Sequence, residues 1–377
     1  MSPKKILKIF IKSIKKIGLK FRKKPLILLS SNSTTMDDHI MHYYNQIKDE
    51  PYKFKFVFWD NNEINKTKYK NFNLKKTQTI TNKLQYILTN PNLIVSADLD
   101  IKNISFFDTK KLYINHGTHT ICFGEQKTAY SYHLETPKFD TYLESSKITY
   151  DYMQTTKYKN NVVYAGTKYS DKYKELAINY EKFRELLGIK SKQKAIFLVG
   201  SWQKKSLFHK LGKPLFEKLK ELAKNKDYKF IVSIHPNEYK VYDPNIEPLG
   251  KYVDELENHE IIVRKPGTDM MPFLIASDLV IADFSSMGDN AVLAGKPLCY
   301  TPFSTDDLFF LSIANRLMNK IPTISTADEL DQIISKPYSK TAMKEINIIK
   351  NDLLTPLGYY KQVCKTETQK LIQQKKS

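Results

Sequence analysis

Residues 281–300 read IADFSSMGDNAVLAGKPLCY and join one apolar strand to the next through a helix. The first strand ends at Ala282, and a helix runs from the serines to about Ala294, where Gly295 and Pro297 end it. Parallel strands need a crossover connection of this kind, which is usually an α-helix. The stretch therefore predicts one strand–helix–strand unit of a parallel sheet.

Short apolar runs of the same kind recur before this stretch and fall into two series. Each series alternates strands with helical or loop segments, which indicates a parallel sheet covered on both faces. We expect an α/β fold with two Rossmann-like domains in tandem, facing a cleft between the carboxyl ends of their sheets. The runs occupy residues 25–31, 54–59, 92–98 and 111–117 in the first series, and 194–201, 228–236, 259–266, 278–286 and 296–301 in the second.

The segment between the two series contains one short apolar run and then a predicted helix from about Lys172 to Leu187. We therefore place the domain boundary near residue 190. The expected parts are a basic helix at 1–24, an N-terminal domain at 25–190, a C-terminal domain at 191–340 and a helical C-terminus at 341–377. Packing of this last part on the first domain is one option that the sequence leaves open.

The composition is that of a globular protein. Its 377 residues are 41% apolar and 12% aromatic, which is enough to bury the cores of two domains. The three cysteines are far apart and form no CxxC pair, which argues against a disulfide framework and a zinc site and fits a reducing cytoplasm. No run reaches the roughly 18 apolar residues of a membrane-spanning helix, and lysines interrupt the N-terminal region where a signal peptide would be apolar.

The formal net charge of +20 is unevenly spread, because ten of the sixty Lys and Arg residues lie between Lys4 and Lys24 without one acidic residue. Apolar residues there, Phe10 among them, recur at helical spacing, with lysines largely on the opposite face. We expect this amphipathic helix to lie on an anionic membrane surface; a helix packed on the domain is the alternative. No nucleic-acid partner is expected, since the rest of the chain has no recognised nucleic-acid motif. The lysines assigned to the membrane are Lys5, Lys8, Lys12, Lys15 and Lys16.

Ligands of such sheets bind just outside the carboxyl ends of the strands, so polar residues at strand exits are the candidate site residues. In YINHGTHT, residues 113–120, His116 follows an apolar strand and Gly117 permits a tight turn into Thr118 and His119. With an ordinary pKa of about 6.5, a neutral histidine can accept a proton from a substrate near neutral pH. A loop histidine that caps the next helix is the alternative.

A second histidine leaves a strand in FIVSIHPNEY, residues 230–239. His235 follows the apolar run, and Pro236 stops the strand because it has no backbone N–H to donate. Such a histidine would face the cleft and donate a hydrogen bond to an anionic oxygen. The alternative is a polar strand end whose imidazole bonds a backbone carbonyl.

The opening stretch supplies the third candidate, Asp283, Ser285 and Ser286, where a strand turns into a helix. A helix N-terminus presents unpaired N–H groups and a partial positive charge, so it binds phosphate readily, and serine hydroxyls add donors. The alternative is that Ser285 or Asp283 is simply the N-cap. One cap needs one such residue, whereas three are clustered here, which favours phosphate binding.

A fourth candidate is LVGSWQKK, residues 198–205, where Gly200 and Ser201 leave the first strand of the second series. Small residues allow a phosphate to approach the backbone closely, although a surface loop explains the nearby lysines equally well. We also assign Arg264, in the run at 259–266, to the same phosphate-binding set. No acidic pair lies at a convincing strand end, so we predict no fixed metal site, and whether the reaction needs a divalent metal stays open.

Taken together and in this order, the motifs of this chain resemble those of one family, which comprises the CDP-glycerol glycerophosphotransferases, the teichoic acid primases and polymerases, and related capsule polymer enzymes. The resemblance covers roughly residues 110–310. It rests on HGT at residues 116–118, AGTKYSD at 165–171, GSW at 200–202, HPN at 235–237 and DFSS at 283–286, which is similar to the family's DYSS.

The resemblance implies a fold of the GT-B glycosyltransferase type, with an N-terminal acceptor domain and a C-terminal nucleotide-donor domain. It implies that His116 deprotonates the acceptor hydroxyl, that His235 stabilises charge on the phosphates, and that Ser285 and Ser286 hold the pyrophosphate of CDP-glycerol. Gly117, Thr118 and His119 would support the acceptor. The reaction would release CMP and extend a lipid-linked or glycan acceptor at the cytoplasmic face of the cell membrane, with the enzyme peripherally attached and no tightly bound cofactor.

The sequence departs from the family pattern at three places. His119 stands where the family has a small residue or proline, and Gln203 stands where it has arginine. In the AGTKYSD turn, Lys168 and Tyr169 fall where the family has proline and arginine. CDP-ribitol or a nucleotide sugar therefore stays open as the donor. The main alternative function is an inverting glycosyltransferase of the same architecture that uses a nucleotide sugar. A non-catalytic membrane-bound adaptor with the same fold is the other.

Overall fold

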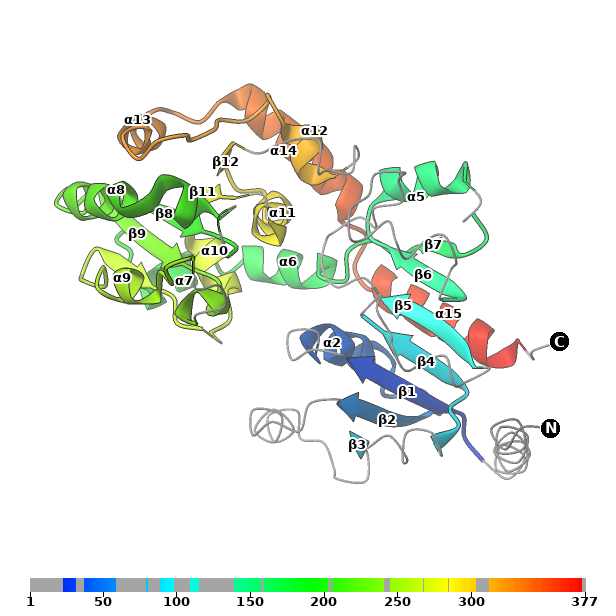
Figure 1. Ribbon diagram of the computed structural model, residues 1–377. Helices are drawn as coiled ribbons and strands as arrows, with labels where there is room; N and C mark the ends of the chain where they lie inside the picture. Colours follow the sequence, from blue (N-terminus) through cyan, green and yellow to red (C-terminus); the bar gives the residue numbers. More distant parts are fainter. Residues whose placement is uncertain are drawn as a thin grey trace. The chain divides into compact units, whose positions relative to one another are not determined.

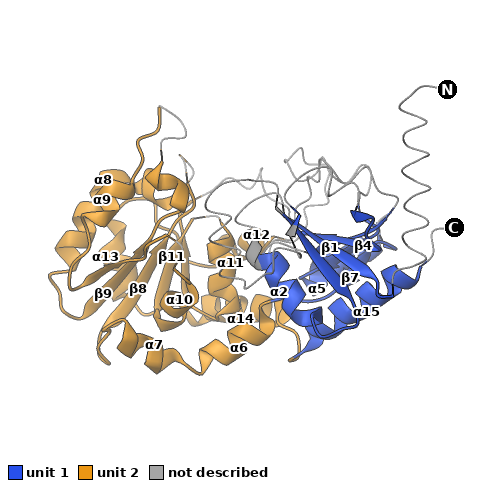
Figure 2. Cartoon of the chain, turned by 90° about the horizontal axis from the view of Figure 1, so that it is seen from below, with its two compact units in different colours: residues 1–117, 121–168, 358–377 blue, residues 118–120, 169–357 orange. Residues whose placement is uncertain are grey.

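The computed structural model of the chain describes residues 23–31, 37–58, 79–80, 89–97, 109–114, 139–156, 159–202, 204, 206–240, 245–266, 268–283, 285–302 and 312–374. These residues form two compact units (Figure 2). The first unit holds the described residues before 169 together with those from 358 onward, and the second is Tyr169–Leu357. Each unit is an α/β structure with its own parallel sheet (Figure 1).

In the described part of the first unit, the sheet has seven strands in the order β3-β2-β1-β4-β5-β6-β7. Every pairing is parallel, as expected from strands that alternate with helices. Its elements are β1 (Leu26–Ser31), α2 (Asp37–Ile47), β2 (Lys53–Phe58), β3 (Thr79–Ile80), β4 (Leu93–Ser96), β5 (Lys110–Ile114), β6 (Thr141–Glu144), α5 (Lys147–Gln154), β7 (Val162–Tyr164) and α15 (Tyr359–Gln373).

Alternating side chains of these strands enter two cores, one on each face of the sheet. Leu112 and Ile114 of β5 pack in a core that α2 and α15 cover, while Tyr113 between them packs on the other face with Tyr142 and Met153 of β6 and α5. Burial on both faces explains why the strands read as continuous apolar runs.

The second unit has a five-stranded parallel sheet among its described residues, in the order β10-β9-β8-β11-β12. Its strands are β8 (Lys194–Val199), β9 (Tyr228–Ser233), β10 (Ile261–Val263), β11 (Leu279–Ala282) and β12 (Leu298–Tyr300). Its helices are α6 (Ser170–Ala177), α7 (Tyr180–Leu186), α8 (Leu207–Leu222), η4 (Pro236–Tyr239), α9 (Gly250–Asp254), α10 (Met271–Ala276), α11 (Ser286–Leu293), α12 (Ile313–Leu317), α13 (Glu329–Ser335) and α14 (Lys340–Leu353).

The two faces of this sheet also carry separate cores. Ile196 and Leu198 of β8 pack with residues of α8, α9 and α13, whereas Phe197 between them packs with residues of α10, α11 and α14. The expectation of two Rossmann-like parallel sheets is therefore confirmed. All nine apolar runs named above contain a strand.

Three details differ from the expectations. The predicted helix at 172–187 is two helices, α6 and α7, because the Asn179 side chain donates to the carbonyl of Glu175 (3.1 Å) where the first one ends. Strands β3 and β6 were not expected. The second unit begins at Tyr169, earlier than the boundary expected near residue 190, because α6 and α7 pack on α10.

The lysine-rich C-terminus is helical but is not one element. Gly358, in the left-handed region at φ 74°, separates α14 from α15. Helix α14 packs on α11 and α12 in the second unit, whereas α15 packs on α2, β4 and β5 in the first. The chain therefore crosses between the two units a second time near residue 357.

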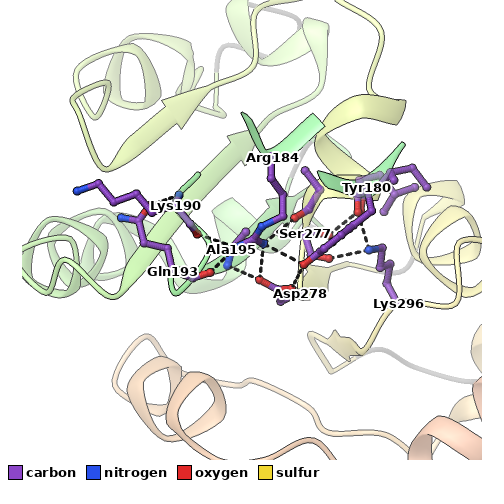
Figure 3. Close-up of polar contacts among 11 residues, drawn as sticks. Tyr180, Arg184, Lys190, Gln193, Ala195, Ser277, Asp278 and Lys296 are labelled. Atoms are coloured by element: carbon purple, nitrogen blue, oxygen red, sulfur yellow. Dashed lines mark hydrogen bonds and ion pairs between the residues drawn. The ribbon is translucent and has the colours of Figure 1, made fainter. Parts of the chain in front are cut away.

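An ion pair between the buried Arg184 and the half-buried Asp278 fastens α7 to the amino edge of the second sheet (Figure 3). Arg184 Nη1 donates to Asp278 Oδ2 (2.8 Å), and the same oxygen accepts from the backbone N–H of Ala195 (2.8 Å). Tyr180 donates its hydroxyl to Asp278 Oδ1 (2.6 Å), and burial is the main reason that its pKa rises to about 12. Lys296 Nζ lies 4.8 Å from the Tyr180 ring centroid. This network lies at the opposite end of the strands from the candidate site.

Most of the basic N-terminal segment, residues 1–22, lies outside the described residues, so the predicted helix and its membrane-facing lysines are not placed. Within the described residues, no helix is long and apolar enough to cross a bilayer.

Candidate functional site

The sheet of the second unit gathers the exits predicted from the sequence at one edge. Strand β8 lies between β9 and β11, and β10 pairs with β9, all parallel. The residues that follow these strands, Gly200, His235, Arg264 and Asp283, therefore lie along the same carboxyl edge. The three ionisable side chains among them interact, since the charges of Asp283 and Arg264 both shift the pKa of His235.

Asp283 turns inward and organises the neighbouring loop. Its side chain is buried, and Oδ2 accepts three hydrogen bonds, from Ser201 N (2.6 Å), Ser201 Oγ (2.9 Å) and Leu207 N (3.0 Å). These bonds join the exit of β11 to the exit of β8 and to the first turn of α8. A buried carboxylate that is used in this way holds the loop after β8 in place, and its negative charge makes it a poor direct ligand for an anion.

Gly200 lets this loop lie close to its neighbours. A Cβ atom at this position would come within 2.8 Å of Phe208 Cδ2 and 3.3 Å of Asp283 Oδ2. Contacts under 3 Å require the ring to move, so glycine is the residue that fits without a shift. The Phe208 ring therefore occupies the space beside Gly200 that was expected to hold a phosphate.

Helix α11 begins at Ser286 with Ser285 as its N-cap. The Ser285 backbone is extended (φ −153°, ψ 170°), and its Oγ accepts the Met287 N–H at 3.4 Å. Of the two cap candidates named above, Ser285 takes the position and Asp283 does not. An N-cap serine accepts with its oxygen and keeps its own hydroxyl hydrogen, so capping and donation to a phosphate are compatible at Ser285.

His235 caps the short helix η4. Its Nδ1 accepts the Asn237 N–H at 3.1 Å, so a neutral ring carries its proton on Nε2. The Trp202 indole stacks on the imidazole, with ring centroids 5.9 Å apart. Burial lowers the pKa of His235 below its ordinary value, and Arg264 lowers it further, while Glu238 and Asp283 act in the opposite direction. His235 thus presents a neutral Nε2–H donor near pH 7.

Arg264 is braced at the exit of β10. Its Nε donates to Ser233 Oγ (2.8 Å) at the end of β9, and Nη1 donates to the Thr268 carbonyl (2.6 Å). Burial lowers the pKa of the guanidinium, which stays charged at neutral pH. Arg264 supplies the fixed positive charge at this edge, beside the neutral His235.

A second histidine near this edge was not expected from the sequence. His209 Nε2 lies 2.9 Å from Glu238 Oε2, and both side chains are largely buried. Glu238 follows directly after the HPN motif, so an acidic residue beside the motif was visible, but nothing in the sequence indicated a partner 29 residues earlier.

In the first unit, β5 ends at Ile114, directly before the expected exit. His116, Gly117, Thr118 and His119 themselves lie outside the described residues. At the same edge, β6 ends at the buried Glu144, whose Oε1 accepts the N–H groups of the next two residues (2.8 and 2.9 Å). Glu144 was not expected, because β6 itself was not.

Among the described residues, no group of three or more His, Cys, Asp or Glu side chains could hold a metal ion. The carboxyl edge of the second unit instead offers hydroxyls, a neutral imidazole, a guanidinium and a helix N-terminus. This set of donors suits a phosphate or pyrophosphate group.

Residues 11–302 match the family described as CDP-Glycerol:Poly(glycerophosphate) glycerophosphotransferase. No curated protein sequence matches the chain.

Similar solved structures include the wall teichoic acid polymerase TagF in a form with a histidine-to-alanine change (TM-score 0.64, 12% identity, 99% of this chain and 100% of the other). A histidine-to-asparagine form of TagF soaked with CDPG has a TM-score of 0.62 at 13% identity and covers 99% of this chain and 96% of the other. The UDP-GlcNAc 2-epimerase from Neisseria meningitidis bound to UDP-GlcNAc has a TM-score of 0.60 at 14% identity, over 92% of this chain and 100% of the other. At these identities the likeness shows a common two-domain, GT-B-like fold.

Proposed function

The chain belongs to the CDP-glycerol:poly(glycerophosphate) glycerophosphotransferase family, and from this premise we propose that it extends a teichoic-acid-like or capsule polymer at the cell surface. It takes glycerol phosphate from CDP-glycerol and transfers it to a hydroxyl of a lipid-linked or glycan acceptor. The soak of TagF with CDPG supports this choice of donor over CDP-ribitol or a nucleotide sugar.

The transfer is a substitution at the phosphorus that carries glycerol. The acceptor oxygen attacks this phosphorus, and the bond from the phosphorus to the bridging oxygen breaks. The bridging oxygen leaves with the electron pair as part of CMP, and the acceptor proton passes to a base. The product is a phosphodiester between glycerol and the acceptor. Negative charge on the phosphate oxygens must be stabilised throughout, so preorganised donors account for much of the rate.

The carboxyl edge of the second unit is the proposed donor site. Ser285 and Ser286 hold the pyrophosphate at the N-terminus of α11, and His235 donates from Nε2–H to a phosphate oxygen. Arg264 supplies the compensating positive charge. Ser201 and Asp283 are hydrogen-bonded to each other. We therefore assign them a role in supporting the loop, in place of the direct phosphate contact expected from the sequence.

The acceptor side is proposed from the family pattern. His116 acts as the base that takes the acceptor proton, and Gly117, Thr118 and His119 support the acceptor. The end of β5 at Ile114 supports a strand exit at this point.

A lipid-linked acceptor has to be reached at the membrane. We propose that residues 1–24 form a basic amphipathic helix that holds the enzyme on the cytoplasmic face, with Phe10 in the lipid boundary. The unmodified protein should sediment with phosphatidylglycerol vesicles but not with phosphatidylcholine vesicles. Replacement of the five lysines named above by glutamine should abolish the binding to phosphatidylglycerol vesicles. Unchanged binding to the anionic vesicles would contradict this role.

One observation carries the donor assignment: the Asn237 N–H occupies Nδ1 of His235, so Nε2–H, which has no acceptor among the described residues, is a neutral donor beside Arg264. In His235→Asn, the amide oxygen can still accept from Asn237, but the Nε2–H is lost. The exposed His259, which pairs with Glu260, offers the control His259→Asn.

The assay measures CMP release from CDP-glycerol in the presence of a lipid-linked acceptor preparation. We expect release that depends on acceptor, collapses in His116→Ala, falls on the order of 100- to 1,000-fold in kcat in His235→Asn and is unchanged in His259→Asn. Release of UDP or GDP from nucleotide sugars, with no CMP from CDP-glycerol, would replace the proposal with the glycosyltransferase alternative.

A further inference from the structure

The pair of His209 and Glu238 has no part in the transfer described so far. Glu238 Oε2 lies 2.9 Å from His209 Nε2, and the two side chains are 4% and 14% exposed. A carboxylate can only accept, so His209 donates its Nε2–H. A hydrogen-bonded pair buried to this degree is well shielded from solvent, so its loss costs more than the loss of an exposed pair.

The pair joins two short elements at the donor site. Glu238 belongs to η4, where its backbone N–H donates to the His235 carbonyl (2.9 Å) and Asn237 N–H donates to the His235 ring (3.1 Å). His209 lies in the first turn of α8, whose Leu207 N–H donates to the buried Asp283. His235 is thereby tied, through Glu238 and His209, to the loop that Asp283 organises.

Both elements are short. The helix η4 is a single four-residue 3₁₀ turn, and such turns have poor hydrogen-bond geometry. The first segment of α8 ends at Gly212, which is non-helical with φ 60°. The orientation of His235 therefore depends on the side chains that anchor its turn.

The turn has a second anchor on its outer side, which offers a matched control. The Tyr239 ring packs over Gly250, where a Cβ would come within 2.5 Å of it, and its hydroxyl donates to Asp254 Oδ1 at 3.2 Å. Tyr239→Phe removes this outer hydrogen bond from the same turn and leaves the His209–Glu238 pair intact.

Glu238 also acts on His235 through its charge. The charged groups that face His235 are Glu238 in its own turn, Asp283 after β11 and Arg264 after β10. Burial is the main cause of the low pKa of His235, and Arg264 adds to it, whereas the negative charge of Glu238 is the largest effect in the opposite direction. Removal of the Glu238 charge should therefore lower this pKa further.

We propose that Glu238, held by His209, is a positioning residue that orients His235 toward the pyrophosphate of the donor. The proposal rests on the proposed function for the identity of that donor. The hydrogen bond and the charge of Glu238 fix the turn and keep Nε2–H of His235 directed at the site, while Glu238 itself touches no substrate.

The test uses the full chain labelled with ¹³C-histidine, in which NMR titration reports the pKa of each of the eight histidines. His235→Asn assigns the His235 signal. We expect Glu238→Gln, which keeps the side-chain volume, to shift the His235 titration to lower pH, and Tyr239→Phe to leave it unchanged. An unchanged His235 pKa in Glu238→Gln would overturn the electrostatic link, whether or not the enzyme turns over CDP-glycerol.

Steady-state CMP release separates positioning from a general loss of stability. Glu238→Ala should lower kcat on the order of 10- to 100-fold, with a smaller change in KM for CDP-glycerol. His209→Gln, whose amide can still donate to Glu238, should restore most of the kcat that His209→Ala loses. Equal kcat values in Glu238→Ala and Tyr239→Phe would overturn the proposal. Absence of CMP release from the unmodified enzyme would overturn the proposed function instead, and the NMR result would still decide whether Glu238 acts on His235.

Discussion

Replacement of Asp283 tests whether one buried carboxylate holds the donor loop. Its Oδ2 accepts three hydrogen bonds that connect the exits of β8 and β11 to α8. In Asp283→Ala the backbone donors of Ser201 and Leu207 lose their acceptor inside the protein, and each unsatisfied group costs about 1 to 3 kcal/mol. We therefore expect the second unit to lose about 2 to 6 kcal/mol of stability. Asp283→Asn keeps an acceptor oxygen without the charge and should cost about 2 kcal/mol.

Two measurements check this prediction. Urea unfolding followed by circular dichroism gives the free energy of unfolding, and hydrogen exchange gives the protection of the Ser201 and Leu207 amides. Asp254→Asn is the control, because Asp254 is 45% exposed and its pair with Lys265 should contribute less than about 1 kcal/mol. If Asp283→Asn leaves both amides as protected as before, with the urea midpoint unchanged, then Asp283 does not hold the loop and the reasoning is refuted.

Gly288→Ala should destabilise the second unit by about 1 to 3 kcal/mol, since the new Cβ would lie 2.4 Å from the Tyr300 ring; a thermal-melting curve equal to the unmodified protein would contradict this close contact. Arg184→Met should cost about 2 to 4 kcal/mol, because the Ala276 and Gln193 carbonyls and the Asp278 carboxylate lose a buried donor. KM for CDP-glycerol should stay unchanged, because this pair lies at the amino edge of the sheet; a raised KM would argue against that separation. His235 has a folded-state pKa below 6.5, so between that pKa and 6.5 the unfolded chain binds more protons and stability falls as the pH decreases. Urea midpoints from pH 7 to 5 should decrease less steeply in His235→Asn, and equal slopes would show that His235 is not the group responsible.

The strands were predictable because burial on both faces of a parallel sheet demands continuous apolar runs. Residues 195–199 and 230–232 are such runs, and each lies within a strand. The strand β6 was missed because its four residues, TYLE, include a polar residue at each end and no apolar run. The division of α6 from α7 was missed because it depends on one side-chain bond from Asn179, which local periodicity does not reveal.

The position of the donor site was also predictable in part. The rule that ligands bind outside the carboxyl ends of parallel strands picks out His235 and Ser285 from the sequence alone. Roles that depend on distant partners were not predictable. Asp283 was expected to contact phosphate, but its neighbours in space come from 76 to 82 residues away and use it as an acceptor. The contact of Glu238 with His209 likewise depends on how η4 lies against α8.

The most direct test of the account is the affinity of CDP-glycerol for the purified chain, measured by isothermal titration calorimetry. The double change Ser285→Ala with Ser286→Ala is compared with Ser339→Ala, which removes the N-cap of α14 in the same unit. We predict at least about tenfold weaker binding in the double variant, from the loss of two phosphate donors, and unchanged binding in Ser339→Ala. Equal affinity for CDP-glycerol in all three proteins would contradict the claim that the turn between β11 and α11 holds the donor.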